Sequence, residues 1–277
     1  MEKKPSTNVQ FTPYEISFCL YDTDRTSQWK QAIEDIVKKG DIVADAGAGT
    51  GILGVFAALD EAEKVYSLEL NKRFVTLIRN LAEKNNVADI IEVIHGDASK
   101  IELPEKIDVL ICELLCTGQF FEPQVQVVNH LRKYFKGNIN IIPNKIESYI
   151  QLYDAHEVLY GVKINTDSRS LLLADDEPVS TKERYDKIDL TKPITEFVDT
   201  HVKVRARVSR IADSVVITSK ANLTDNIVTE RTKFLYNPEL IYLKEPIELI
   251  KGQYYSIHIS YAYGSDTLDA DISVSPV

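Results

Sequence analysis

The sequence is poor in the residues that mark several specialised classes of protein. Its 277 residues include three cysteines, Cys19, Cys112 and Cys116, which cannot all pair in disulfides, so a reduced intracellular setting is expected. Cys112 and Cys116 have no nearby histidine, and the five histidines are scattered, which argues against a zinc site. We therefore expect a cytoplasmic protein without a bound metal.

Long apolar runs and an excess of basic residues are also missing. No run reaches the roughly 18 apolar residues that a membrane helix needs, and the N-terminal MEKKPSTNVQ lacks the apolar core of a secretory signal. The net charge is −10, whereas broad nucleic-acid binding needs a basic footprint. We expect neither a membrane partner nor direct nucleic-acid binding, and an acidic protein is compatible with a basic substrate. Arg205, Arg207 and Arg210 could form a basic strip, although strands often carry such charges on their wet face.

The order of apolar patterns predicts an α/β protein in two parts. Up to about residue 143, short apolar strand patterns alternate with helical patterns, which is typical of a parallel sheet. From residue 145 onward, runs of alternating apolar and polar residues predict an antiparallel β-barrel or sandwich. We expect a Rossmann-like domain over residues 1–144, with an N-terminal arm over 1–26, and a β domain over 145–277. Polar residues about 161–200 predict an insertion in the β domain.

Individual elements follow from the same patterns. The stretch 14–20 alternates apolar and polar residues and fits either a strand or the edge of a helix. The expected strands of the parallel sheet are 42–44, 65–68, 90–94, 107–112 and 139–142. The expected helices are 27–39, 52–59, 71–85 and 123–135.

The most informative stretch is DIVADAGAGTGILGVFAAL, residues 41–59. A short apolar strand ends at Asp45, glycines follow at positions 47, 49 and 51, and a helical pattern begins at Ile52. Glycines in such a turn let the backbone approach a ligand, and the helix start offers free N–H groups. The third glycine of the dinucleotide fingerprint G-x-G-x-x-G is replaced by Ile52, so that fingerprint fails. A glycine turn of some other α/β protein is the alternative interpretation.

The pattern D-x-G-x-G-x-G resembles the cofactor loop of Rossmann-like S-adenosylmethionine methyltransferases. Glu69 ends the second expected strand, about where an acid would accept hydrogen bonds from a ribose. Asp45 and the glycines Gly47, Gly49 and Gly51 would then face the methionine part of S-adenosyl-L-methionine. Asp97 and Ser99 would contact the adenine, or they form an ordinary turn.

Two further acids follow the fourth expected strand. Glu113 stands directly after it, and Glu122 comes nine positions later in the same loop. Two carboxylates in one loop could clamp a guanidinium, because its planar fork of donors matches carboxylates bidentately. An exposed acidic loop is the alternative interpretation.

From about Asp24 to the C-terminus, the chain resembles the protein arginine methyltransferases. The resemblance rests on DRT at 24–26, AGAGTGILGVFAA, Leu68-Glu69, DVLICE at 108–113, the spacing of Glu113 and Glu122, and IIPNKIESYI at 141–150. It implies that Glu113 and Glu122 are the catalytic pair, and that Arg25 holds the cofactor carboxylate and orients one of them. It also implies transfer of a methyl group to arginine side chains of a protein or peptide, with S-adenosyl-L-homocysteine as product, and a homodimer. For Arg25, pairing with a surface acid is the alternative.

The chain departs from the family's pattern in the substrate half. Leu114 and Leu115 stand where the family has tryptophan and methionine. The family's Thr-His-Trp loop corresponds to TERTKF, residues 229–234, which contains neither histidine nor tryptophan. Two other hypotheses therefore stand beside arginine methylation: a methyltransferase acting on a small-molecule amine or another acceptor, and a cofactor-binding protein without arginine activity.

Overall fold

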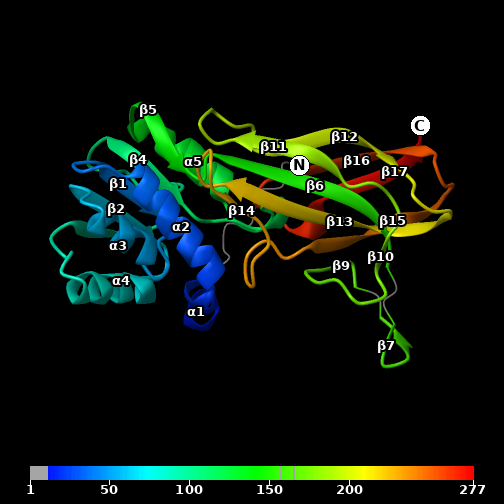
Figure 1. The fold of residues 1–277 in the computed structure, drawn as a ribbon, viewed down its shortest axis with the longest axis horizontal. Helices are drawn as coiled ribbons and strands as arrows, with labels where there is room; N and C mark the ends of the chain where they lie inside the picture. The colour runs from blue at the N-terminus through cyan, green and yellow to red at the C-terminus, as the bar shows by residue number, and fades with distance from the viewer. Residues whose placement is uncertain (1–11, 156–157, 165) are drawn as a thin grey trace.

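The computed structural model describes residues 12–155, 158–164 and 166–277. The first eleven residues of the expected arm lie outside the described residues. Figure 1 shows a parallel sheet with its helices at one end of the molecule and antiparallel sheets at the other. This arrangement confirms the predicted fold class.

The first part is a five-stranded sheet in the order β3-β2-β1-β4-β5, with every neighbouring pair parallel. Its strands are β1 (Ile42–Ala46), β2 (Lys64–Glu69), β3 (Ile91–His95), β4 (Ile107–Cys112) and β5 (Phe135–Ile142). The order reverses direction between β1 and β4. Ligands of such sheets bind beyond the carboxyl ends of the strands at this reversal.

The helices of the first part follow the expected pattern with two differences at its beginning. They are α1 (Pro13–Tyr21), α2 (Thr23–Ile36), α3 (Ile52–Leu59), α4 (Lys72–Lys84) and α5 (Gln124–Leu131), with short 3₁₀ helices η1 (Thr117–Gln119) and η2 (Arg132–Tyr134). The ambiguous stretch 14–20 is helical, because Thr12 and Glu15 form a capping box. The second helix begins at Thr23 instead of residue 27, because the Asp22 side chain caps it through the Arg25 N–H.

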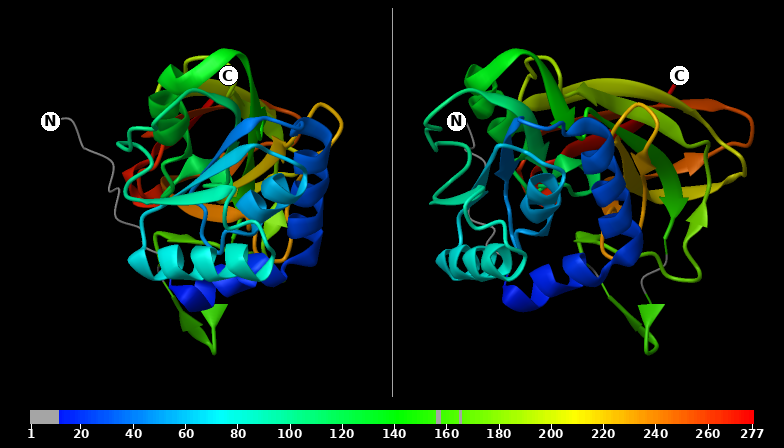
Figure 2. Two further views of the ribbon diagram at one scale, coloured as in Figure 1. Left: turned by 90° about the vertical axis from the view of Figure 1, so that its left-hand side faces the viewer. Right: turned by 60° about the vertical axis from the view of Figure 1, so that its left-hand side comes forward.

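The second part consists of antiparallel strands. A seven-stranded sheet contains β6 (Lys145–Asp154), β9 (Ser168–Arg169), β10 (Glu177–Pro178), β11 (Glu183–Asp189), β13 (Arg210–Asn222), β14 (Val228–Thr229) and β15 (Glu239–Leu249). A three-stranded sheet contains β12 (Phe197–Arg205), β16 (Tyr254–Ala262) and β17 (Asp271–Pro276), with η3 (Thr267–Asp269) before the last strand. Figure 2 shows these sheets curving around one another beside the helical part.

The segment 161–200, for which an insertion is predicted, contains short strands, the whole of β11 and the first residues of β12. A two-stranded hairpin, β7 (Val158–Leu159) and β8 (Val162–Lys163), projects from the body, as Figures 1 and 2 show. The chain returns by β11, which pairs with β6 along its length. The polar residues of β11 and β12 occur at the exposed positions of strands that alternate buried and exposed residues.

The two parts share one core. Fully buried Ile111 of the parallel sheet and fully buried Ile150 and Ile257 of the antiparallel sheets belong to one continuous apolar cluster. The parallel sheet ends at Ile142 and β6 begins at Lys145, but the division into domains at residues 144 and 145 stays a prediction. None of the helices in the described residues has the length and apolar character needed to cross a membrane.

Candidate active site

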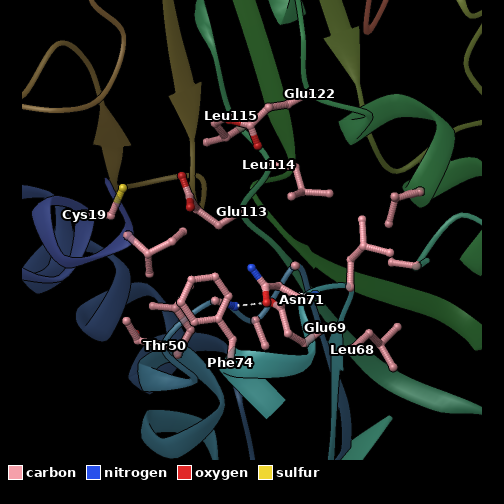
Figure 3. Close-up of a pocket in the computed structure, with 18 of the residues that line it drawn as sticks. Cys19, Thr50, Leu68, Glu69, Asn71, Phe74, Glu113, Leu114, Leu115 and Glu122 are labelled. Atoms are coloured by element: carbon pink, nitrogen blue, oxygen red, sulfur yellow. Dashed lines mark hydrogen bonds between the residues drawn. The ribbon is translucent and has the colours of Figure 1, made fainter. Parts of the chain in front are cut away.

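A cavity of about 230 Å³ lies beyond the carboxyl ends of β1 and β4, where the strand order reverses. Its walls come from α1, α2, the loop after β1, the end of β2, the loop after β3, the loop after β4 and the loop before β15. Five of the predicted cofactor residues line it, together with both predicted catalytic acids: Arg25, Gly47, Gly49, Glu69, Asp97, Glu113 and Glu122. Figure 3 shows Glu113 and Glu122 on the opposite side of this cavity from Glu69 and Asn71.

The glycine loop forms one wall. The N–H of Gly47 donates to the carbonyl of Leu68 over 3.1 Å, which ties the loop to the end of β2. Gly47 has a φ of +75°, and a Cβ placed there would lie 2.5 Å from the Leu114 side chain. Only glycine therefore fits between the cavity and the loop after β4.

Glu69 is the acid at the end of β2. Its carboxylate accepts from the N–H of Gly49 over 2.7 Å and from the N–H of Asn71 over 2.6 Å. Burial raises the pKa of Glu69, while these backbone hydrogen bonds oppose the increase. The carboxylate is thus fixed in the cavity wall and keeps lone pairs for hydroxyl donors.

Asp97 lines the cavity, but Ser99 does not. The Ser99 hydroxyl donates to Asp97 over 2.6 Å, and Lys100 Nζ donates to the other oxygen over 2.6 Å. Burial opposes ionisation of Asp97, but these hydrogen bonds prevail and lower its pKa overall. Ser99 therefore holds Asp97 in place, and its contact with a ligand stays a prediction.

Asp45 and Gly51 were also predicted to face the cofactor, and the structure places both behind the loop. Asp45 is 1% exposed, and its carboxylate accepts from the N–H of Gly54 in α3 over 3.0 Å. Burial raises the pKa of Asp45 to about 7. Gly51 caps α3, with Ile78 against the position of its missing Cβ. Both residues shape the turn between β1 and α3 and do not line the cavity.

Arg25 forms an ion pair with Glu113, and both side chains are largely buried. The same guanidinium donates to the carbonyl of Cys19 over 3.1 Å, which joins α2 to α1. Burial raises the pKa of Glu113, and the charge of Arg25 opposes this increase. Burial also raises the pKa of Cys19 to about 11, so its thiol stays protonated near neutral pH.

Glu122 faces the same space from the other end of the loop (Figure 3). Burial and the negative charge of Glu113 raise its pKa to about 8, against the opposing effect of Arg25. The two carboxyl groups thus differ in their electrostatic surroundings. Glu113 is ion-paired, whereas Glu122 is largely protonated.

The antiparallel part holds the loop between the two glutamates. Ser219 accepts from the N–H of Gly118 over 2.9 Å, and the Tyr261 hydroxyl donates to the Gly118 carbonyl over 2.7 Å. The ring of Phe120 stacks on Tyr261 with centroids 4.3 Å apart. Gln119 and Phe121 have positive φ values of 56° and 61°, a backbone conformation that surrounding contacts must stabilise.

The segment in the place of the family's Thr-His-Trp loop also reaches the cavity. Phe234 lines it and stacks on Phe18 of α1 with ring centroids 4.8 Å apart. Asp22 accepts from the Thr232 hydroxyl over 2.6 Å and from the N–H of Phe234 over 2.9 Å. Polar and aromatic contacts therefore join this loop to the two N-terminal helices without a histidine or tryptophan.

Several lining residues were not predicted as site residues. Asn71 and Phe74 line the cavity at the start of α4. Asn71 could have been predicted from the sequence, because it stands where the expected strand that ends at Glu69 passes into a helix. Ile16, Leu20 and Phe234 come from segments whose sequence carries no such signal. The remaining unpredicted lining residues include Cys19, Ala48, Thr50, Ile52, Leu53, Leu68, Leu70, Gly96, Ala98, Leu114, Leu115, Phe121, Pro123, Val127 and Leu235.

Tyr236 was also missed. It is 3% exposed, its φ is +55°, and its hydroxyl has no hydrogen-bond partner within the described part of the chain. Burial first, and the charges of Cys116, Glu113 and Glu122 after it, raise the pKa of Tyr236. Its buried hydroxyl is thus an unused donor near the two glutamates.

The residues present fit S-adenosyl-L-methionine. The glycine loop borders the cavity, and the fixed carboxylate of Glu69 suits the hydroxyls of a ribose. Apolar side chains such as Leu70 and Phe74 line the adjoining part of the cavity. Within the described residues no group of three or more histidine, cysteine or acidic side chains could hold a metal ion.

Several known protein sequences are similar to this chain. Residues 23–134 match the family described as ribosomal protein L11 methyltransferase (PrmA). The chain is 33% identical over 249 residues to the uncharacterized protein MJ1452 of Methanocaldococcus jannaschii, covering 89% of this chain and 91% of that protein. It is 36% identical over 168 residues to the histone-arginine methyltransferase CARMER of Drosophila persimilis, covering 59% of this chain but only 31% of that protein.

Solved structures share the fold. The Trypanosoma brucei PRMT1 enzyme-prozyme heterotetrameric complex with AdoHcy matches with a TM-score of 0.73 and 16% identity, over 92% of this chain and 95% of that one. Protein arginine methyltransferase 10 of Arabidopsis thaliana matches with a TM-score of 0.72 and 18% identity, over 87% of this chain and 85% of that one. The chain therefore belongs to the same family as MJ1452, and it is similar in sequence to an arginine methyltransferase and in fold to two others.

Proposed function

We propose that this enzyme methylates the guanidinium group of arginine side chains in proteins or peptides and releases S-adenosyl-L-homocysteine. The observation that carries the proposal is the pair of carboxyl groups, Glu113 and Glu122, in the wall of the cofactor cavity. A guanidinium presents donors in a rigid fork that two carboxylates can grip together. The catalytic roles of Glu113 and Glu122 are part of this proposal.

The two glutamates would have different roles in binding the guanidinium. Arg25 fixes Glu113 and favours its ionised form, so Glu113 would offer a negative charge to the incoming cation. Glu122, whose pKa is raised to about 8, would ionise when the substrate's positive charge arrives. The clamp would aim one guanidinium nitrogen at the donor, which is positioning catalysis.

S-adenosyl-L-methionine supplies an electrophilic methyl group on a sulfonium. Forming the new nitrogen–carbon bond requires the attacking nitrogen to lose one proton, since the methylated guanidinium remains a cation. We assign that proton to Glu122, because its pKa is raised to about 8 and Glu113 is held in the ion pair with Arg25. The family's barrel histidine is replaced here by the segment 229–234, so this chain needs another acceptor.

The proposal is tested with methyl-labelled S-adenosyl-L-methionine and an arginine-rich peptide mixture, beside a matched mixture with lysine in place of arginine. Label on the arginine peptides alone, lost in Glu113→Gln, is expected. Label on lysine peptides or on small amines only would favour the alternative acceptor. Tight cofactor binding by calorimetry with no transfer to any acceptor would favour a cofactor-binding protein.

A homodimer and a cytoplasmic location complete the proposal. The projecting β7–β8 hairpin carries the exposed apolar residues Val158, Tyr160 and Val162, which a second copy could cover. The three free cysteines support a reduced compartment. Sedimentation equilibrium showing only monomer at micromolar concentration would remove the dimer from the proposal.

A further inference from the structure

The end of the antiparallel part farthest from the parallel sheet carries a surface that the active site does not use (Figure 1). It is built from residues 203–211, around the turn from β12 to β13, and residues 250–254, around the turn from β15 to β16. We name this surface the basic tip. Backbone hydrogen bonds hold the two turns together: Ala206 N–H donates to the Gln253 carbonyl and Gly252 N–H donates to the Ala206 carbonyl, each over 2.9 Å.

The basic tip reverses the charge of the chain locally. Its two segments contain five basic residues and no acidic one, in a chain with a net charge of −10. All five are exposed: Lys203, Arg205, Arg207, Arg210 and Lys251. Arg210 lies 3.4 Å from Asp154, whereas Arg207 and Lys251 form no ion pair within the part of the chain that the structure describes. Concentrated, unneutralised cations favour an anionic partner.

The same two segments also carry exposed apolar side chains. Val208, Ile211 and Ile250 are 39%, 55% and 52% exposed. Val208 lies in one turn and Ile250 in the other, and Lys251 N–H joins these turns by donating to Ser209 Oγ over 3.0 Å. A partner that covers this surface therefore needs both negative charge and apolar groups.

We propose that the basic tip docks an acidic segment of a partner protein in which apolar residues are interspersed with the acids. A nucleic acid fits less well, because Lys203 Nζ covers the Tyr254 ring at 4.4 Å from its centroid, and aliphatic side chains gain nothing from phosphates. A lipid surface fits less well, because three aliphatic side chains on turns offer little area to insert and no amphipathic helix accompanies them. Docking at this surface is independent of methyl transfer.

The proposal is tested by fluorescence anisotropy with the full-length protein. The probe is a labelled peptide of glutamates interspersed with leucines, and the variant is Arg207→Glu/Lys251→Glu. The matched control is Arg79→Glu/Lys84→Glu, which reverses two exposed charges on α4 at the opposite end of the molecule. Val208→Ser/Ile250→Ser tests the apolar component, and thermal unfolding checks that every variant is folded.

We expect the peptide's Kd to rise about tenfold or more with the charge reversal at the tip, and several-fold with the serine variant, but little with the control. An equal loss in the control, or no binding at all, would overturn the proposal. Tighter binding of phosphatidylserine vesicles or of a single-stranded oligonucleotide than of the peptide, lost with the same tip variants, would assign the surface to a lipid or nucleic-acid partner instead.

Discussion

The guanidinium of Arg25, on α2, and the carboxylate of Glu113, just past β4, form an ion pair in the wall of the cofactor cavity. The pair joins the N-terminal helices to the loop that carries both proposed catalytic acids. Since Arg25 also holds the carbonyl of Cys19, one side chain connects α1, α2 and the catalytic loop. The position of Glu113 therefore depends on the N-terminal segment.

Arg25→Met leaves Glu113 buried without its partner, and we expect it to destabilise the protein by about 3–5 kcal/mol. Glu113→Gln removes the unpaired charge, so the double variant should regain part of this loss, with a coupling of about 0.5–3 kcal/mol. Urea unfolding of the wild type, both single variants and the double variant measures the cycle. Additive effects would show that the two residues do not interact.

The raised pKa of Glu122 predicts how activity depends on pH. Because Glu122 is largely protonated in the empty enzyme below pH 8, kcat/KM for an arginine peptide should rise with pH through about 8. The bound guanidinium stabilises the ionised form, so the corresponding rise of kcat should lie at lower pH. If kcat/KM of Glu122→Gln still rises with pH through about 8, the rise must come from the ionisation of another group.

The raised pKa of Glu122 also predicts how the free energy of unfolding depends on pH. A carboxyl whose pKa is higher in the folded than in the unfolded protein binds more protons when folded, so stability falls as pH rises between the two values. For Glu122 this interval runs from about 4.5 to about 8. Glu122→Gln should therefore flatten the fall of the unfolding free energy with pH. Asp45→Asn is the matched comparison variant. The pKa of Asp45 is also raised by burial, to about 7, but Asp45 lies away from the catalytic loop.

Much of the fold was predictable because local signals delimit its elements. The run 107–112 ends before the acid Glu113, and the run 52–59 lies between Gly51 and Asp60; these runs have the bounds of β4 and α3. The stretch 14–20 was ambiguous, because its apolar residues alternate as in a strand and the cap at Thr12 decides for a helix. The insertion at about 161–200 stays a prediction, and the strand β11 within it was not predicted because polar residues on half-exposed strands resemble a connection.

The candidate site was predictable where it follows the ends of strands. Glu69, Asp97 and Glu113 reach one cavity because parallel strands end at one edge of the sheet. Asp45 also ends a strand, but its side chain turns toward α3, which a strand-end rule does not distinguish. Phe18 and Phe234 lie far apart in the sequence and stack only through tertiary packing, so no spacing in the sequence predicts this contact.

Gly47→Ala should impair both folding and cofactor binding. The new Cβ would lie 2.5 Å from Leu114 Cδ2, and the positive φ adds strain, for a total cost of about 1–3 kcal/mol. Gly40→Ala is the control, because its φ is +87° and no atom lies within 4 Å of the new Cβ. It should cost only the strain, about 1 kcal/mol. Equal stability and equal S-adenosyl-L-methionine binding in both variants, by calorimetry, would contradict this account of the loop.

The variant Tyr236→Phe distinguishes a structural from a functional role of the Tyr236 hydroxyl, which has no hydrogen-bond partner among the described residues. Removing a buried hydroxyl without a partner should leave stability unchanged or raise it by about 1 kcal/mol. If the hydroxyl hydrogen-bonds to a glutamate or to the substrate during the reaction, kcat/KM should fall about tenfold or more. Unchanged kcat/KM would leave Tyr236 as a packing residue.

The central claim is that Glu113 and Glu122 direct a methyl group to a guanidinium nitrogen. Amino-acid analysis of an arginine peptide after incubation with methyl-labelled S-adenosyl-L-methionine identifies the methylated atom directly. We predict that the label is found in methylarginine, and that it is absent from the products of Glu113→Gln and strongly reduced for Glu122→Gln, while both variants still bind the cofactor. Label in methyllysine or in a free amine, or undiminished methylarginine from Glu113→Gln, would contradict the claim.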